Sequence, residues 1–279
     1  MILFLIFVYL FSFIDALCNI INNKNEFISK INENAEIYNI QNEIVFDNHD
    51  IININSRKVS FIGNSNDSII KFLNTSSINI SFHENCDDIE IRNMNIIGNF
   101  KFNNNKSIKF VNVTYNGFFI SNNKILTNNS TIQISSSKFQ LSNEYNGYEI
   151  YNYNVDIKNS SFYGNNNYNL FLMKIENEEN NFRNSNINYS FFTGNYCNSA
   201  VSISYSNIIC TYTKFEKFFS GRELNSGGAL NLFYTRNVFN NTDFEDNYSE
   251  GDGGSISFKY SIDTEIHIMS FKNTTSTVS

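Results

Sequence analysis

Carboxylates are the residues of this sequence that could act on a carbohydrate, because two of them can serve as general acid and base at a glycosidic bond. Two groups are present, Asp87-Asp88 and Asn241-Thr242-Asp243. They occur in the reverse of the order found in pectinase-type hydrolases, and the sequence has no Gly-His-Gly. It has no Pro either, which excludes the Arg-x-Pro of polysaccharide lyases. A nucleophile elbow, a P-loop and a zinc-binding His/Cys pair are also missing. The sequence therefore predicts no catalytic residue.

An acidic stretch is the best candidate for a metal site, because Ca²⁺ takes several oxygen ligands on a flexible loop. Its members are Asp243, Glu245, Asp246, Glu250 and Asp252. The alternative is solvated loop charge without a metal. No other cofactor is predicted.

A tyrosine cluster is the candidate for ligand binding, because Tyr presents an apolar ring with a polar tip that can stack on a sugar. It comprises Tyr145, Tyr148, Tyr151 and Tyr153. The alternative is an aromatic-rich loop that packs on the body of the fold.

The charge balance excludes one class of partner. The formal net charge is −7, and Lys and Arg are scattered singly rather than clustered. Nucleic-acid binding needs a clustered basic face that neutralises phosphates, so no nucleic-acid partner is expected. Apolar residues make up 41% of the chain and recur at regular intervals, which excludes a disordered chain.

The amino-terminal segment predicts export. Residues 2–14 are apolar except for Ser12, and small residues follow at Ala16 and Cys18. This run is too short to span a bilayer and matches a signal peptide over residues 1–18, with an uncleaved anchor as the alternative. Cleavage predicts a secreted or cell-surface protein with no membrane span.

Three cysteines remain after that cleavage. Cys197 and Cys210 form a disulfide if they lie on neighbouring turns, and otherwise they are small buried apolar side chains. Asn-x-Ser/Thr sequons permit N-glycosylation on outward loops, among them Asn112, Asn159, Asn188 and Asn247.

These residues must be positioned by an internal repeat. Large apolar residues recur with a mean spacing near 26 residues. The nine anchors are Phe61, Ile96, Tyr115, Phe139, Phe162, Phe192, Phe215, Phe244 and Phe271. Five residues before each anchor the side chain is apolar except at Ser56, and Ile or Val is common two residues earlier still. Gly often stands two residues after the anchor and Asn three, where each suits a left-handed corner.

A unit this short cannot bury its own apolar face, so successive units must stack. The repeat predicts an all-β fold, a single-stranded right-handed parallel β-helix of nine to ten rungs over residues 44–279. Residues 19–43 are expected to cap it, with a short helix from Lys24 to Asn34. The other end is expected to be uncapped, either through truncation or because a partner covers it.

The second half of the array resembles a known family. Gly227-Gly228-Ala229-Leu230 and Phe244-Glu245-Asp246-Asn247 are similar to the Gly-Gly-Ala-Ile and Phe-x-x-Asn repeats of polymorphic outer-membrane-protein β-helices. Further copies are Phe61–Asn64, Phe162–Asn165, Phe192–Asn195, the looser Gly253–Ile256 and the more distant Asn198–Val201. The resemblance covers about residues 44–279 and is sharp from Phe162 onwards. It implies a surface or secreted β-helix linked to adhesion. The membrane-barrel domain of that family has no counterpart, so its transport mechanism is not carried over.

Two functions are compatible with these features. The first is a non-catalytic secreted or surface β-helix that binds an extracellular glycan or protein or serves structurally. The second is a carbohydrate-active enzyme of the pectate-lyase-like class. The missing catalytic groups favour the first, although a fold alone does not decide function.

Overall fold

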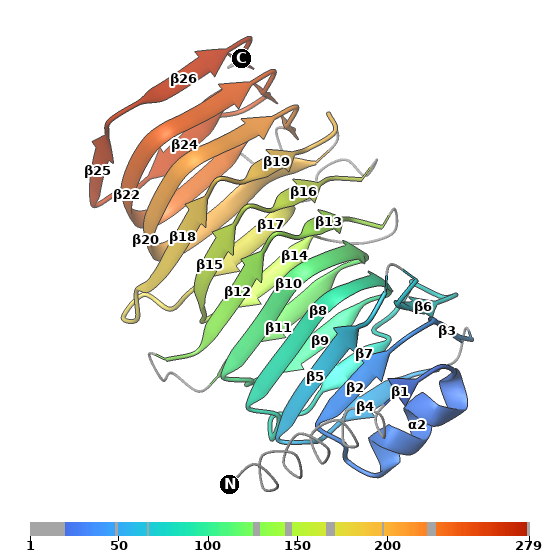
Figure 1. The fold of residues 1–279 in the computed structure, drawn as a ribbon. Helices are drawn as coiled ribbons and strands as arrows, with labels where there is room; N and C mark the ends of the chain where they lie inside the picture. Colours follow the sequence, from blue (N-terminus) through green and yellow to red (C-terminus); the bar gives the residue numbers. More distant parts are fainter. Residues whose placement is uncertain are drawn as a thin grey trace, which may run out of the picture.

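The described part of the chain forms a parallel β-solenoid of about eight turns with a short helix near its amino-terminal end. Figure 1 shows this computed structural model as a ribbon. The structure describes residues 20–47, 50–65, 67–124, 129–142, 147–165, 171–196, 198–221 and 227–277. The predicted parallel β-helix is thus confirmed, with somewhat fewer turns than the nine to ten expected. The predicted signal peptide (residues 1–18) lies outside the described residues.

The strands are short, and most alternate inward and outward side chains, as expected for a solenoid wall. Their bounds are β1 (Ile20–Ile21), β2 (Ile37–Ile40), β3 (Glu43–Phe46), β4 (Ile52–Ile54), β5 (Lys58–Gly63), β6 (Ile69–Phe72), β7 (Ile80–Phe82), β8 (Asp88–Ile97), β9 (Phe100–Asn103), β10 (Ser107–Asn116), β11 (Phe119–Asn122), β12 (Thr131–Ser135), β13 (Lys138–Gln140), β14 (Tyr148–Tyr151), β15 (Asn154–Lys158), β16 (Ser161–Tyr163), β17 (Phe171–Glu176), β18 (Arg183–Asn188), β19 (Phe191–Thr193), β20 (Ser199–Glu216), β21 (Phe219–Ser220), β22 (Leu230–Glu245), β23 (Tyr248–Ser249), β24 (Ile256–Lys259), β25 (Asp263–Ile266), β26 (Met269–Lys272) and β27 (Thr275–Ser276).

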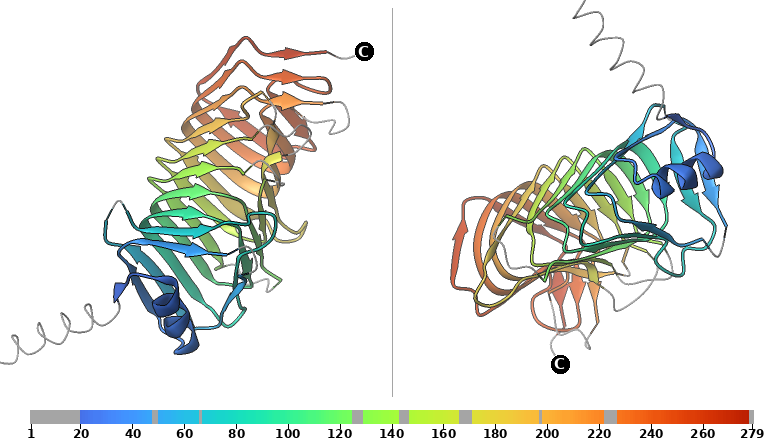
Figure 2. Two further views of the ribbon diagram at one scale, coloured as in Figure 1. Left: turned by 90° about the vertical axis from the view of Figure 1, so that its right-hand side faces the viewer. Right: turned by 90° about the horizontal axis from the view of Figure 1, so that it is seen from below.

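The wall has three long faces, and the longest strands bend through corners and contribute to more than one of them (Figure 2). The first face runs through β2, β5, β8, β10, β12, β15, β18, β20, β22 and β25. The second runs through β3, β6, β8, β10, β13, β16, β19, β20, β22 and β26. The third runs through β4, β7, β9, β11, β14, β17, β20, β22 and β24. A small parallel sheet joins β21, β23 and β27.

The predicted anchors form the inward column of the second face. Eight of the nine are successive Cα partners, from Ile96 through Tyr115 to Phe271. From Phe139 onwards their rings stack in parallel, with centroids 4.8 Å apart between Phe162 and Phe192 and 5.3 Å apart between Phe215 and Phe244. The apolar residue five positions earlier forms the matching column of the first face, from Ile91 to Ile266.

Phe61 is the one anchor that the repeat spacing assigns to the wrong face. Its Cα partner is Ile91, so it belongs to the first-face column, and Ile70 fills the second-face position of that turn. The cause is a longer connection, since nine residues separate Phe61 from Ile70 where later turns have five. Ser56 therefore falls outside the first-face column.

The predicted role of the glycines holds in part. Gly98 and Gly117 have positive φ, at 155° and 149°. Gly164 instead allows a close approach, because a Cβ there would lie 2.2 Å from Oδ1 of Asn198 on the next turn. Most left-handed residues lie elsewhere. Five Asn residues stand three positions after an anchor, and of these only Asn195 (φ 53°) is left-handed; the other four are Asn64, Asn99, Asn165 and Asn247.

Helix α2 (Lys24–Asn32) lies across the amino-terminal end of the rod, which confirms the predicted helix (Figure 2). Asn23 caps it by accepting a hydrogen bond from the backbone N–H of Glu26 at 3.0 Å. The buried Phe27 packs on Tyr38, Phe46 and Phe61. No helix of the described residues is long and apolar enough to cross a membrane.

The last turn differs from those beneath it in exposure. Ile266 and Phe271 are 53% and 54% exposed, whereas their partners Phe239 and Phe244 are 0% and 1% exposed. The two inward columns therefore end in Ile266 and Phe271, which pack on the turn beneath them and are exposed on their other side.

A buried row of hydroxyls runs along the corner between the first and second faces. Its members are Ser137, Ser160, Ser190, Thr213 and Thr242. The Ser137 N–H donates to Oγ of Ser160 at 3.2 Å, and the Ser160 N–H donates to Oγ of Ser190 at 3.3 Å. Four of the five hydroxyls accept from a buried backbone N–H of the neighbouring turn, since Val113 donates to Ser137 and Ser190 donates to Thr213 in the same way.

Candidate functional site

The corner between the first and second faces holds a left-handed residue in nearly every turn, three positions before the aromatic column. Asn93, Asn112 and Asn159 fill it in earlier turns, with φ between 50° and 55°. Asn tolerates this conformation because its short side chain can hydrogen-bond locally. Tyr189 and Tyr212 take the same position in two later turns, with φ of 50° and 48°.

Tyrosine is an unusual choice for this corner. A left-handed backbone costs roughly 1–2 kcal/mol for a residue with a bulky side chain, and outliers of this kind cluster at functional sites. The rings of Tyr189 and Tyr212 stack with centroids 4.9 Å apart and planes 5° apart. They remain 55% and 53% exposed. We call these two residues the corner pair.

The corner pair lines a groove of about 710 Å³ on the outer surface. Its other wall consists of outward residues from the second face, which stand two positions after the corner: Ser161, Phe191, Lys214 and Asp243. Because the second-face strands stack in parallel, these side chains form a row beside the tyrosine rings.

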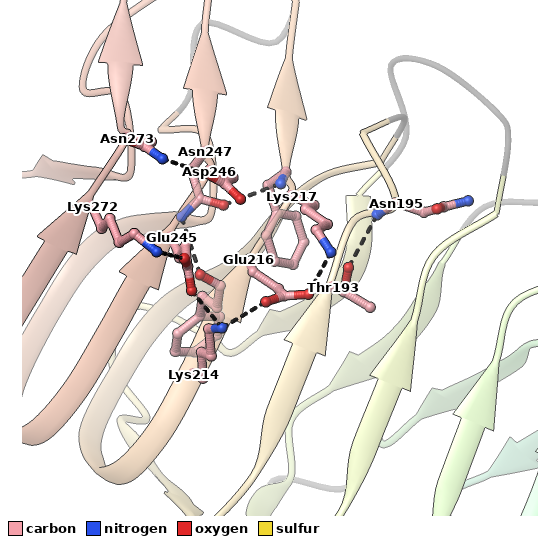
Figure 3. A network of polar contacts seen from close by, with 12 residues as sticks. Thr193, Asn195, Lys214, Glu216, Lys217, Glu245, Asp246, Asn247, Lys272 and Asn273 are labelled. Carbon is pink, nitrogen blue, oxygen red and sulfur yellow. Dashed lines mark hydrogen bonds and ion pairs between the residues drawn. The ribbon is translucent and has the colours of Figure 1, made fainter.

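Lys214 is held in place by two carboxylates, as Figure 3 shows. Its Nζ lies 2.7 Å from Oε2 of Glu216 and 2.6 Å from Oε2 of Glu245. These hydrogen bonds raise the pKa of Lys214, so the ammonium stays charged. Glu245 also accepts from Lys272, and the two lysines lower the pKa of Glu245 to about 2. Among the described contacts, two of the three N–H groups of Lys214 are used, which leaves one to donate to a ligand.

The groove thus combines an aromatic platform, a fixed N–H donor and a carboxylate acceptor. Asp243 supplies the acceptor, and its Oδ1 already receives the hydroxyl of Ser270. A sugar ring presents an apolar face and hydroxyl edges, which these groups match.

The two predicted carboxylate groups are too far apart for paired-carboxylate catalysis. Asp87 and Asp88 lie at β8, and Asp243 lies at the end of β22, six strand pairings further along the rod. At about 4.8 Å for each pairing they are roughly 29 Å apart. The two groups therefore cannot act on one glycosidic bond.

The predicted calcium ligands are distributed over separate contacts. Glu245 pairs with Lys214 and Lys272, Asp243 accepts from Ser270, and Asp246 accepts from Asn273 at 3.0 Å. Glu250 and Asp252 follow β23, which belongs to the separate small sheet with β21 and β27. The described residues include no group of three or more His, Cys, Asp or Glu side chains that could hold a metal ion.

The predicted sugar-stacking tyrosines mostly face inward. Tyr148 and Tyr153 are 0% exposed, so their rings belong to the core and cannot meet a sugar. Tyr151 is half-buried on β14, with its hydroxyl donating to Glu149 at 3.0 Å. Tyr145 lies outside the described residues. Period-two alternation explains the burial, since Tyr148 and Ile150 point to the same side.

The remaining predicted sites are placed as follows. Cys210 is a free buried thiol whose burial raises its pKa to about 12, and its predicted partner Cys197 lies outside the described residues. Asn112 and Asn159 are exposed at left-handed corners, and Asn188 is half-buried. Asn247 is 1% exposed and donates to the carbonyl of Phe215, so a glycan on it is incompatible with this fold.

Sequence reasoning missed the corner pair because it followed the inward column and not the bend before it. A signal was present. In five turns a Ser or Thr precedes the anchor by two residues, at Ser137, Ser160, Ser190, Thr213 and Thr242. The residue before that hydroxyl is Ser, Asn, Tyr, Tyr and Asn in turn. The two tyrosines interrupt a position that small polar residues otherwise fill, which identifies them.

No family model matches this chain, and no curated protein or solved structure matches it at a significant level. The assignment of the fold therefore rests on strand pairing and register, and the function rests on the site.

Proposed function

We propose that this protein is a non-catalytic, secreted or cell-surface β-solenoid that binds an extracellular glycan in the groove beside the corner pair. One observation carries the proposal. Two stacked tyrosine rings are held exposed at strained left-handed corners, where neighbouring turns use Asn. The rings pack on each other yet stay more than half exposed, and backbone strain at such a position supports a function that needs the rings outside.

The chemistry of the groove supports a sugar as the ligand. Tyr189 and Tyr212 offer a flat apolar face, while Lys214 and Asp243 offer a donor and an acceptor at its edge. The resemblance of the later turns to adhesive surface β-helices supports the same reading. The residues that carry it stack in register, with Val201, Leu230 and Ile256 as successive Cα partners.

The test is a binding measurement with a variant that should stay folded. In Tyr189→Asn/Tyr212→Asn both rings are replaced by the residue that already occupies this corner in other turns. We expect unchanged or higher thermal stability and at least about tenfold weaker binding to immobilised glycans, equivalent to about 1.4 kcal/mol.

Tyr151→Ala is the matched control, because it removes a half-buried tyrosine outside the groove. Its binding should equal that of the wild type. Equal binding by the double Asn variant, or loss of binding in the control alone, would overturn the assignment of the groove. Release of unsaturated products or new reducing ends from polyuronates would overturn the non-catalytic part of the proposal.

A further inference from the structure

A second row of tyrosines lies at the opposite edge of the first face. Tyr205, Tyr234 and Tyr260 occupy left-handed corners in three successive turns, with φ of 51°, 50° and 56°. Their rings stack with centroids 5.3 Å and 4.9 Å apart. Tyr260 is 68% exposed, and Tyr205 and Tyr234 are half-buried. We call these three residues the tyrosine ladder.

The tyrosine ladder and the corner pair frame the same stretch of wall. Tyr205 and Tyr212 belong to one strand, β20, and are seven residues apart. At about 3.3 Å per residue their backbones are roughly 23 Å apart. The outward residues between them lie on the first face of β18, β20 and β22. A long ligand that crosses this face meets aromatic rings at both edges.

The outward residues of the framed stretch are almost free of charge. On β18 and β20 they are amides, hydroxyls and one exposed aliphatic side chain, Ile209. On β22 Arg236 is the one charged member, and its guanidinium lies 5.7 Å from the ring centroid of Phe182. Rows of Asn side chains contact each other across turns, as between Asn207 and Asn184 at 3.2 Å. Amides and hydroxyls suit a ligand that is rich in neutral hydrogen-bonding groups.

Charged rows border this stretch on both sides. The preceding turn carries Asp156 and Lys158 on the outer side of β15, and the following turn carries Asp263 and Glu265 on β25. The charge-poor part of the wall is thus limited to β18, β20 and β22, and the turn that begins at Tyr260 already carries Asp263 and Glu265. A polyanion would find Arg236 alone on the framed stretch and a net charge of −7 on the whole chain.

We infer that the ligand is an uncharged polysaccharide whose chain crosses the first face from the corner pair to the tyrosine ladder. This inference rests on the proposed function and extends it, because it names the class of glycan and adds a second contact. Simultaneous contact at both edges makes the second binding event intramolecular and raises the affinity for long chains over short ones.

The experiment measures affinity against chain length by calorimetry. The probes are soluble oligomers of β-1,4-linked glucose and of β-1,4-linked N-acetylglucosamine, with galacturonate oligomers as the charged counterpart. For the wild type we expect affinity to rise about tenfold or more once the oligomer is long enough to span both edges, about 23 Å.

The decisive variant is Tyr205→Asn/Tyr234→Asn/Tyr260→Asn, which keeps a residue type suited to left-handed corners. It should bind short oligomers as the wild type does and lose the gain with length. A gain that persists in this variant, or that is missing in the wild type, would overturn the inference and leave the groove proposal intact. Tighter binding of galacturonate chains would overturn the uncharged class. Failure of every oligomer to bind the wild type would overturn both proposals.

Discussion

Phe162 and Phe192 stack face to face on successive turns, with ring centroids 4.8 Å apart and planes 5° apart. Both are fully buried, and Phe139 and Phe215 continue the stack on either side. Phe162→Ala removes a ring from the middle of this column and leaves a cavity that the rigid wall cannot close. We expect the free energy of unfolding to fall by about 3–5 kcal/mol in urea denaturation.

Phe271→Ala is the matched control, because it lies in the same column but is 54% exposed. It should destabilise the protein by clearly less than Phe162→Ala does. Equal losses in the two variants would contradict the importance of the buried column.

Ser160 links two turns through its hydroxyl. Oγ of Ser160 accepts from the N–H of Ser137 at 3.2 Å and donates to the carbonyl of Lys158 at 2.8 Å. Ser160→Ala leaves the buried N–H of Ser137 without this acceptor, so we expect a loss of about 1–3 kcal/mol in unfolding free energy. Ser160→Thr should retain most of the stability, because Thr213 and Thr242 fill the same row. Similar stability of the Ala and Thr variants would show that the hydroxyl does not matter.

The inward columns were predictable from sequence because burial constrains them in nearly every turn. Ile91, Phe110 and Ile134 repeat one apolar position, and the spacing of five residues to the next column is fixed by the bend. Phe61 was assigned to the wrong face because its turn has a longer connection, and spacing alone cannot show which face a residue joins. Register is set by pairing with the next turn, which a single turn's sequence does not contain.

The site was less predictable for a different reason. Tyr148 and Tyr153 were predicted to stack on a sugar because they cluster in the sequence. Clustering does not show which way a side chain points, and the alternation of side chains places both rings in the core. Tyr189 and Tyr212 stand 23 residues apart and become neighbours only through stacking of turns. Their left-handed backbone could be suspected from the Asn that fills the same position elsewhere, but only after the corner was located.

The thiols of Cys86 and Cys210 are predicted to be unreactive towards alkylation in the folded protein. Burial raises the pKa of each thiol to about 12, so neither forms a thiolate at neutral pH, and neither is accessible. Treatment of the native protein with iodoacetamide should leave both unmodified in peptide mass spectrometry. The same treatment in urea should modify both, which serves as the positive control. Modification of Cys210 at a similar rate in both conditions would contradict its burial.

Glu245 is predicted to make stability depend on pH in the acid range. Hydrogen bonds from Lys214 and Lys272 lower its pKa from 4.5 to about 2 in the folded state. Because the folded-state pKa is depressed, the stabilisation is fully present above the unfolded-state value and is lost as pH falls towards about 2. Glu245→Gln keeps the shape of the side chain and removes its charge. The variant should therefore melt at a lower temperature than the wild type at about pH 6, and the difference should shrink to nothing at about pH 2.

A difference in melting temperature that is constant with pH would show that the lost contact is steric and that the ion pairs of Figure 3 contribute nothing to folding. Lys272→Met provides the second arm, since loss of one lysine should move the acid loss of stability to higher pH.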